Sequence, residues 1–141
     1  DNIEVCPGTP LLWDQRYAGA FKDLKFFHAA VLVGSIVSKP SEDLICLNLG
    51  HKSVASEMDF PRLKLLNMKN LKQVSHSEEH LVVECNGSDE YSVGTICYAI
   101  PTHICPTVPK YEKVLTVIDG EVTGDWKVAA RDHSTKSILY K

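Results

Sequence analysis

Two potential metal ligands, His103 and Cys105, lie two residues apart in the segment 98–108. Alternate residues of an extended backbone point to the same face, so an imidazole and a thiolate at this spacing can converge on one ion. Both groups are good zinc ligands. Pro101 and Pro106 flank the pair and predict a stiff loop that leaves a strand. Two protein ligands leave positions open for water or substrate, which is typical of a catalytic rather than a structural metal.

The same two residues also have an interpretation without a metal. In it, His103 is hydrogen-bonded within a loop and Cys105 packs as a small apolar residue. The spacing alone leaves both interpretations open.

Length and composition indicate one globular domain. The chain has 141 residues, of which 44% are apolar and 23% are charged, and this balance excludes a wholly disordered chain. The formal net charge is -3, and no run of like charge exceeds a few residues. Because a phosphate-backbone binder normally carries a concentrated basic face, we expect no nucleic-acid partner.

No segment is suited to a lipid bilayer. The longest apolar stretch, residues 29–37, contains Gly34 and Ser35 and falls short of the roughly 20 residues that span a membrane. We therefore expect no membrane partner. The chain opens on Asp1 without a Met, a basic segment or a small-residue cleavage site, which predicts an excised piece without a signal peptide.

The cysteines indicate a reducing compartment. Their number is odd and they are spread widely, at Cys6, Cys46, Cys85, Cys97 and Cys105. A secreted disulfide framework usually has an even number in a shorter chain, so we expect reduced thiols and a cytoplasmic location. A secreted disulfide domain is the alternative, and a count of free thiols under denaturing conditions would test it.

Regularly spaced turn-forming clusters predict short strands between them. Turn-forming clusters occur at residues 38–43, 86–89, 119–120 and 123–125. Runs rich in Val, Ile and Leu lie between them, at residues 29–37, 44–49, 80–85, 93–100, 114–118 and 126–130. No segment shows a long amphipathic helical period. The sequence therefore predicts a mainly β domain, an antiparallel barrel or sandwich.

Three places are less regular. The leucines of residues 63–71 fit either a core-facing helix or an irregular loop packed on the barrel. Glu78, Glu79 and His80 would alternate between the faces of a strand, so they cannot converge, and His80 is expected to pack or to support a site. Trp126 is expected in the core.

Five segments, in one order, carry a resemblance to a known family. They are residues 4–9 with Asp14, 48–56, 77–80, 101–108, and 119–122 with 126–131. In them the chain resembles the C-terminal part of the D-threonine aldolase and D-serine dehydratase group, which are fold-type III, alanine racemase-like pyridoxal-phosphate enzymes. The resemblance covers nearly the whole chain.

The resemblance implies positions for two groups. In that family an N-terminal (β/α)8 barrel carries pyridoxal phosphate on a lysine, and a C-terminal β domain supplies a metal-binding loop whose ligands correspond to His103 and Cys105. Gly8 and Thr9 correspond to a turn that approaches the cofactor phosphate. Glycine lets the backbone come close, and an amide with a hydroxyl suits a phosphate. Without the resemblance, Pro7 and Gly8 would be interpreted as a simple turn.

The resemblance also divides the chain. Residues 1–22 correspond to a short remnant of the cofactor-binding barrel, and residues 23–141 to a C-terminal, D-serine dehydratase-like β domain. The Schiff-base lysine would lie upstream, since Lys22, Lys25 and Lys52 are not in its context. We therefore expect no catalytic residue in this chain and no activity from the fragment alone.

The resemblance implies a lyase that depends on pyridoxal phosphate and a divalent metal, and the chemistry of the two ligands favours zinc. The substrate would be a small β-hydroxy D-amino acid, and the reaction dehydration or aldol cleavage. Cys105 favours the dehydratase, because aldolases of the group often use a carboxylate as the second ligand. Expected partners are the upstream barrel and a second copy in a homodimer. The alternative is a non-catalytic β-barrel interaction module in which His103 and Cys105 are structural.

Overall fold

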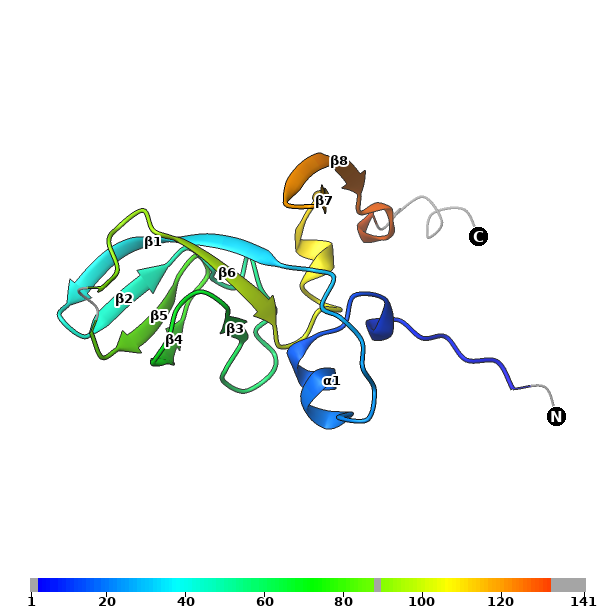
Figure 1. The fold of residues 1–141 in the computed structure, drawn as a ribbon, viewed down its shortest axis with the longest axis horizontal. Coiled ribbons are helices and arrows are strands. Elements are labelled where there is room, and N and C mark those ends of the chain that lie inside the picture. Colours follow the sequence, from blue (N-terminus) through cyan, green and yellow to red (C-terminus); the bar gives the residue numbers. More distant parts are fainter. Residues whose placement is uncertain (1–2, 88–89, 133–141) are drawn as a thin grey trace, which may run out of the picture.

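Six antiparallel strands form one curled sheet in the order β3-β6-β1-β2-β5-β4 in the computed structural model of the chain (Figure 1). The structure describes residues 3–87 and 90–132. The strands are β1 (Leu32–Ser41), β2 (Leu44–Leu47), β3 (Leu63–Leu65), β4 (Leu71–His76), β5 (Leu81–Cys85) and β6 (Ile96–Pro101). The predicted mainly β, antiparallel fold is confirmed, with one curled sheet in place of a sandwich.

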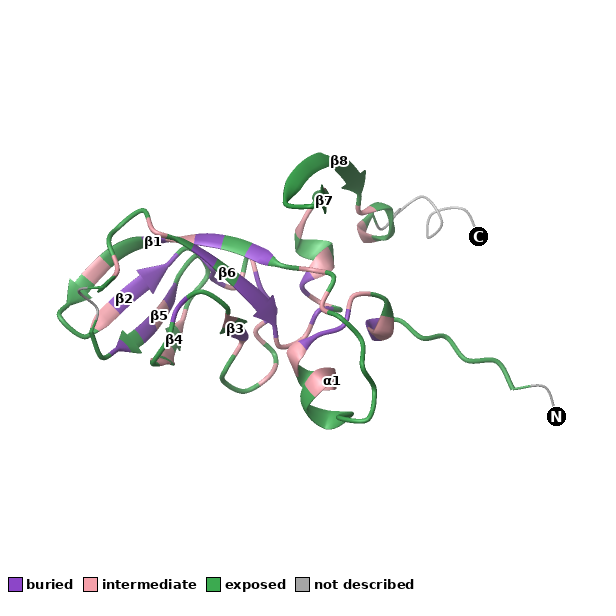
Figure 2. Ribbon diagram, in the orientation of Figure 1, coloured by how far each residue is buried: buried purple, intermediate pink, exposed green. Residues whose placement is uncertain are grey.

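The inner face of the sheet forms the core. Along β1, Leu32 and Ile36 are buried while Val33 and Val37 are exposed, as expected for a strand with one face packed. Buried residues of β2, β5 and β6 belong to the same cluster, and the ribbon is purple where residues are buried in Figure 2. Gly34 also faces inward, where a Cβ would lie 2.6 Å from Cγ of Leu49. The close approach of these two segments therefore requires glycine.

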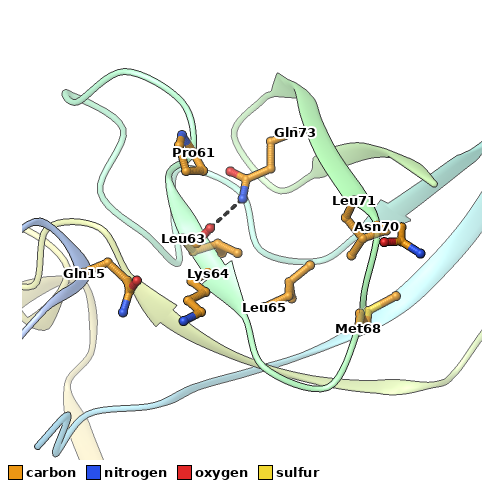
Figure 3. Close-up of a pocket in the computed structure, with 9 residues that line it drawn as sticks. All are labelled: Gln15, Pro61, Leu63, Lys64, Leu65, Met68, Asn70, Leu71 and Gln73. Carbon is orange, nitrogen blue, oxygen red and sulfur yellow. Dashed lines mark hydrogen bonds between the residues drawn. The ribbon is translucent and has the colours of Figure 1, made fainter. Parts of the chain in front are cut away.

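A side chain joins the two edge strands of the curled sheet. The Gln73 amide on β4 donates to the carbonyl of Leu63 on β3 at 2.6 Å, and its oxygen accepts from the Arg62 backbone N–H at 2.7 Å. Figure 3 shows the hydrogen bond between Gln73 and Leu63 among the residues that line a pocket between β3 and β4. The sheet therefore closes here through one amide rather than through a ladder of backbone hydrogen bonds.

Residues 63–71 differ from both sequence interpretations. They form a short strand, β3, which pairs with the end of β6, and a loop that leads to the start of β4 at Leu71. Leu63 is buried, Lys64 is exposed and Leu65 is half-buried, which is a strand alternation over only three residues. A period needs more residues than this to be recognised in a sequence.

A separate hairpin follows the sheet. It consists of β7 (Lys113–Ile118) and β8 (Glu121–Lys127), joined by Asp119 and Gly120, whose φ values are 51° and 84°. Positive φ at both positions fits the twist of a two-residue hairpin turn. The expected strand at 126–130 is therefore wrong in its bounds, because β8 ends at Lys127 and a 3-10 turn spans Ala129–Arg131. Trp126 is 71% exposed, so its expected place in the core is also wrong. The hairpin forms its own two-stranded sheet (Figure 1).

The first part of the chain forms two short helical turns. A 3-10 turn spans Thr9–Leu11 and helix α1 spans Gln15–Ala20. Asp14 caps α1, because its side chain accepts a hydrogen bond from the Tyr17 backbone N–H. A boundary between two domains at residue 22 stays a prediction. Among the described residues, no helix has the length and apolar character needed to cross a membrane.

Candidate functional site

The candidate site is the loop 101–108, which continues from β6 and ends in a 3-10 turn at Val108–Lys110. Ile104 is 4% exposed and anchors the middle of the loop, while His103 and Cys105 on either side of it are more accessible. The sheet therefore delivers the two potential ligands to one end of the barrel-like fold.

His103 is held by a carboxylate from another segment. Its Nδ1 lies within hydrogen-bond distance of Oε1 of Glu57. Burial raises the pKa of the Glu57 carboxyl, but hydrogen bonds from its own backbone N–H and from His103, together with the charges of His103 and Arg62, hold it below its ordinary value. The Glu57 carboxylate therefore faces His103 as a hydrogen-bond acceptor.

Cys105 has its own partner. Its Sγ lies 3.1 Å from the hydroxyl oxygen of Thr9, which comes from the opposite end of the chain. Thr9 is 7% exposed, whereas Cys105 is exposed. The structure therefore brings Thr9 to Cys105, which lies two positions from His103 on the same loop. Gly8 precedes Thr9 and is exposed, with open space where a Cβ would stand.

Asp14 fixes the residue between the two potential ligands. Its Oδ2 accepts from the Ile104 backbone N–H at 3.0 Å, and its Oδ1 accepts from the Tyr17 backbone N–H at 2.9 Å. Asp14 is fully buried. The Arg16 backbone N–H also donates to the carbonyl of Thr102 at 3.1 Å. The start of α1 is therefore joined to the loop by hydrogen bonds on both sides of His103.

Thr107 closes the loop from within. Its hydroxyl donates to the His103 carbonyl at 2.7 Å and accepts from the Ala55 backbone N–H at 3.1 Å. The Thr107 side chain is 1% exposed. The loop is thus cross-linked to the segment that carries Glu57, which restricts where the His103 ring can lie.

These residues fit a divalent metal ion of the zinc type. An imidazole and a thiol are accessible on one loop, and each has a partner that orients it. Within residues 3–87 and 90–132, no group of three or more His, Cys, Asp or Glu side chains is arranged to hold a metal. His103 and Cys105 are therefore the two side chains of this loop whose chemistry suits such an ion.

Sequence reasoning did not identify Glu57, Thr107 or the contact of Asp14 with the loop. Glu57 and His103 are 46 positions apart, and Asp14 and Ile104 are 90 positions apart, so no local spacing could connect them. Asp14 and Thr107 lie inside the segments that carry the family resemblance, whereas Glu57 follows the segment 48–56 and lies outside them. Contacts of Gly8 and Thr9 with a phosphate stay a prediction.

A second polar group lies at the turn between β4 and β5. Lys52 Nζ lies 3.5 Å from a Glu78 oxygen and 2.9 Å from a Glu79 oxygen. The expected strand placement of residues 78–80 is wrong, because they form the connection and both carboxylates converge on one ammonium group. His80 is exposed, so its expected packing role is wrong as well. Lys52 is engaged in exposed ion pairs, which contribute little to stability.

His76 makes the stability of the domain sensitive to acid. Its Nε2 lies 3.0 Å from the Leu49 carbonyl, and its Nδ1 is buried without a protein partner. Burial lowers the pKa of His76, and the neighbouring His51 and Arg62 lower it further. As pH falls below the ordinary histidine pKa, the unfolded chain takes up the proton first. Stability is therefore present above that value and is lost as pH falls through the folded pKa.

We therefore expect the free energy of unfolding to fall between about pH 7.5 and about pH 5.5, on either side of the ordinary histidine pKa. His76→Gln keeps a donor for the Leu49 carbonyl but does not titrate, so its stability should depend less on pH. Urea unfolding at both pH values measures the difference, with the exposed histidine variant His80→Gln as control. Equal pH slopes for wild type and His76→Gln would contradict the assignment.

The similarity of this chain to known proteins includes both the sheet and the loop. A family model described as "Putative serine dehydratase domain" matches residues 29–117, which contain all six strands of the sheet and residues 101–108. Among curated proteins, a D-threonine aldolase from Arthrobacter sp is 28% identical over 134 residues, covering 93% of this chain and 35% of the aldolase.

Solved structures show the same fold. A D-threonine aldolase from Filomicrobium marinum aligns with a TM-score of 0.76 and 23% identity, over 89% of this chain and 34% of that one. A D-threo-3-hydroxyaspartate dehydratase from Delftia sp. HT23 aligns with a TM-score of 0.60 and 14% identity, over 72% and 32%. Two mutants of such a dehydratase replace a histidine and a cysteine two positions apart, the cysteine mutant being in the metal-free form. The chain spans about a third of the length of these relatives.

Proposed function

This chain belongs to the serine dehydratase domain family, and we propose that it is the metal-binding domain of a lyase that acts on β-hydroxy D-amino acids. The observation that carries the proposal is the pair of oriented ligands on one loop. His103 is hydrogen-bonded to Glu57 and Cys105 to Thr9, so each has the outer partner that metal ligands in proteins normally have. A histidine and a cysteine at this same spacing were the replaced residues in the dehydratase mutants.

His103 and Cys105 would hold a divalent ion, with zinc favoured because magnesium and calcium prefer oxygen ligands. A zinc ion held there would supply Lewis acidity to the β-hydroxyl of a substrate. The hydrogen bonds of Asp14 and Thr107 to the loop keep the two side chains in place while the substrate is exchanged. Cys105 is exposed, so a substrate could reach an ion that His103 and Cys105 would hold.

The whole protein would also use pyridoxal phosphate, which stabilises negative charge at Cα of an amino acid. The cofactor lysine would lie in an upstream barrel, and Gly8 and Thr9 would meet the phosphate. The structure supports Gly8 best, because its backbone is exposed while the Thr9 hydroxyl already contacts Cys105. A homodimer and a cytoplasmic location complete the proposal.

Two reactions fit the same site. In dehydration the β-hydroxyl leaves as water, and hydrolysis of the resulting enamine yields a 2-oxo acid and ammonia. In aldol cleavage the hydroxyl loses its proton and the Cα–Cβ bond breaks, which yields glycine and an aldehyde. Cys105 favours dehydration, whereas the 28% identity to a D-threonine aldolase favours cleavage.

The full-length protein, incubated separately with D-serine, D-threonine and D-threo-3-hydroxyaspartate, decides between them. We expect turnover of at least one D-isomer and none of the L-isomers, with 2-oxo acid and ammonia measured against glycine and aldehyde. Turnover should be lost after chelation and restored by zinc. Full turnover after complete removal of metal would contradict the role of the loop. No turnover of any β-hydroxy D-amino acid would favour the non-catalytic interaction module.

A further inference from the structure

We propose that Glu57 is a positioning residue of the metal site, which holds the proton of His103 on Nδ1 and leaves Nε2 as the metal-binding atom. The inference rests on the proposed function for the metal itself. The tautomer that it assigns to His103 is a property of the protein without metal.

The geometry of the pair determines the tautomer. Nδ1 of His103 lies within hydrogen-bond distance of Oε1 of Glu57. An ionised carboxylate only accepts hydrogen bonds, so the imidazole must donate from Nδ1. The neutral ring then carries its lone pair on Nε2, the atom on the other side of the ring. A carboxylate behind a metal-ligating histidine also fixes the orientation of the ring and raises its basicity.

Hydrogen bonds connect the backbone segments that carry Glu57 and His103. Thr107 connects the His103 carbonyl to the Ala55 backbone N–H, two residues before Glu57. Val54 and Ala55 are 0% and 4% exposed, so the backbone that leads to Glu57 is packed. The Tyr111 hydroxyl donates to the Ser53 carbonyl at 2.9 Å and anchors the same segment from the far side of the loop. The Glu57–His103 contact is therefore built into the packing of two segments.

The His103 side chain is more shielded from solvent than the side chains of the surface ion pairs. The His103 side chain is 23% exposed and the Glu57 side chain 47%. By contrast, Lys52 and its partner Glu79 are 62% and 63% exposed. At 47%, Glu57 is no less exposed than Asp125 of the surface pair with Lys113, at 45%, so the shielding of the contact comes from the His103 side alone.

The experiment uses the full-length protein and two readouts. Glu57→Gln keeps the size of the side chain but offers both an oxygen and an NH2 group to His103, so it no longer forces the proton onto Nδ1. Glu57→Ala removes the partner. Glu121→Gln, on the exposed strand β8, is the matched control. The first readout is the tautomer of His103 in metal-free protein, from 15N-labelled histidine. Signals of His103 are assigned by their absence from His103→Ala.

The second readout is zinc affinity, measured by competition with a chromophoric chelator. We expect the Nδ1–H tautomer in wild type and in Glu121→Gln, and an increased share of the other tautomer in Glu57→Gln. Zinc affinity should fall about 10- to 100-fold in both Glu57 variants, as is typical for partners of metal ligands. With cobalt in place of zinc, the thiolate-to-cobalt absorption should persist in Glu57→Gln, because Cys105 still binds.

The outcomes separate the two proposals. Two outcomes would overturn the role of Glu57 while leaving the metal site in place. One is an Nε2–H tautomer in wild type. The other is a zinc affinity that stays within about twofold of wild type in both Glu57 variants, without the drop expected for an outer partner. An Nδ1–H tautomer that depends on Glu57 in a protein that binds no zinc would overturn the proposed function and the metal-directed part of this inference together. It would retain only the assignment of the tautomer.

Discussion

Replacement of either potential ligand, His103→Ala or Cys105→Ala, is expected to remove the metal ion and most of the lyase turnover from the full-length protein. The loop offers only these two protein ligands among the described residues, so one substitution leaves a single ligand. The loss of zinc affinity should exceed the about 10- to 100-fold that is typical of an outer partner. Absorbance of the bound cofactor should remain, because its lysine is expected in the upstream barrel.

Metal content by elemental analysis and turnover with and without added zinc measure this effect. His80→Ala, at an exposed histidine, and Cys46→Ala, at a thiol on β2, are the matched controls, because neither residue contacts the loop in any described hydrogen bond. Both controls should keep metal and turnover. Wild-type turnover in the two ligand variants after chelation would show that the loop is structural.

Substitution of the buried carboxylate, Asp14→Ala, is expected to lower the free energy of unfolding by about 2–4 kcal/mol. Two lost hydrogen bonds contribute to this decrease in the free energy of unfolding. The Tyr17 backbone N–H loses its helix-capping acceptor, and the buried Ile104 backbone N–H loses its only described acceptor. Because Ile104 lies between His103 and Cys105, the same substitution should also weaken zinc binding.

Urea unfolding measures the first effect and chelator competition the second. Asp59→Ala removes an exposed carboxylate and serves as control, with a change expected within about 0.5 kcal/mol, as for most surface substitutions. Unfolding of Asp14→Ala at the wild-type urea concentration, together with unchanged zinc affinity, would contradict the anchoring role of Asp14. Normal stability with weakened zinc binding would assign Asp14 to the loop alone.

Local patterns in the sequence were sufficient for most of the sheet. Runs rich in Val, Ile and Leu at residues 29–37 and 80–85 predicted strands that the structure has as β1 and β5, and Asp119 with Gly120 predicted a turn that the structure has in a hairpin. These signals are local, because an apolar run and the turn residues beside it can be recognised within a few neighbouring residues. Trp126 shows where local reasoning failed. Its apolar character predicted burial, but the hairpin forms a sheet of its own outside the core.

Likewise, only part of the candidate site could be predicted from the sequence. The proximity of His103 and Cys105 follows from the sequence, since residues two positions apart stay near each other in any fold. The expected extended backbone is wrong, because Ile104 lies in a bend and residues 105–107 form a turn closed by hydrogen bonds to the Ile104 carbonyl. Their partners do not follow from it. Thr9 reaches Cys105 across 96 positions and Glu57 reaches His103 across 46, and such contacts arise only when the sheet has curled and brought distant segments to one end. The sequence by itself therefore determined which atoms could bind a metal, whereas the tertiary structure decided which residues orient them, because no local period encodes a contact between distant segments.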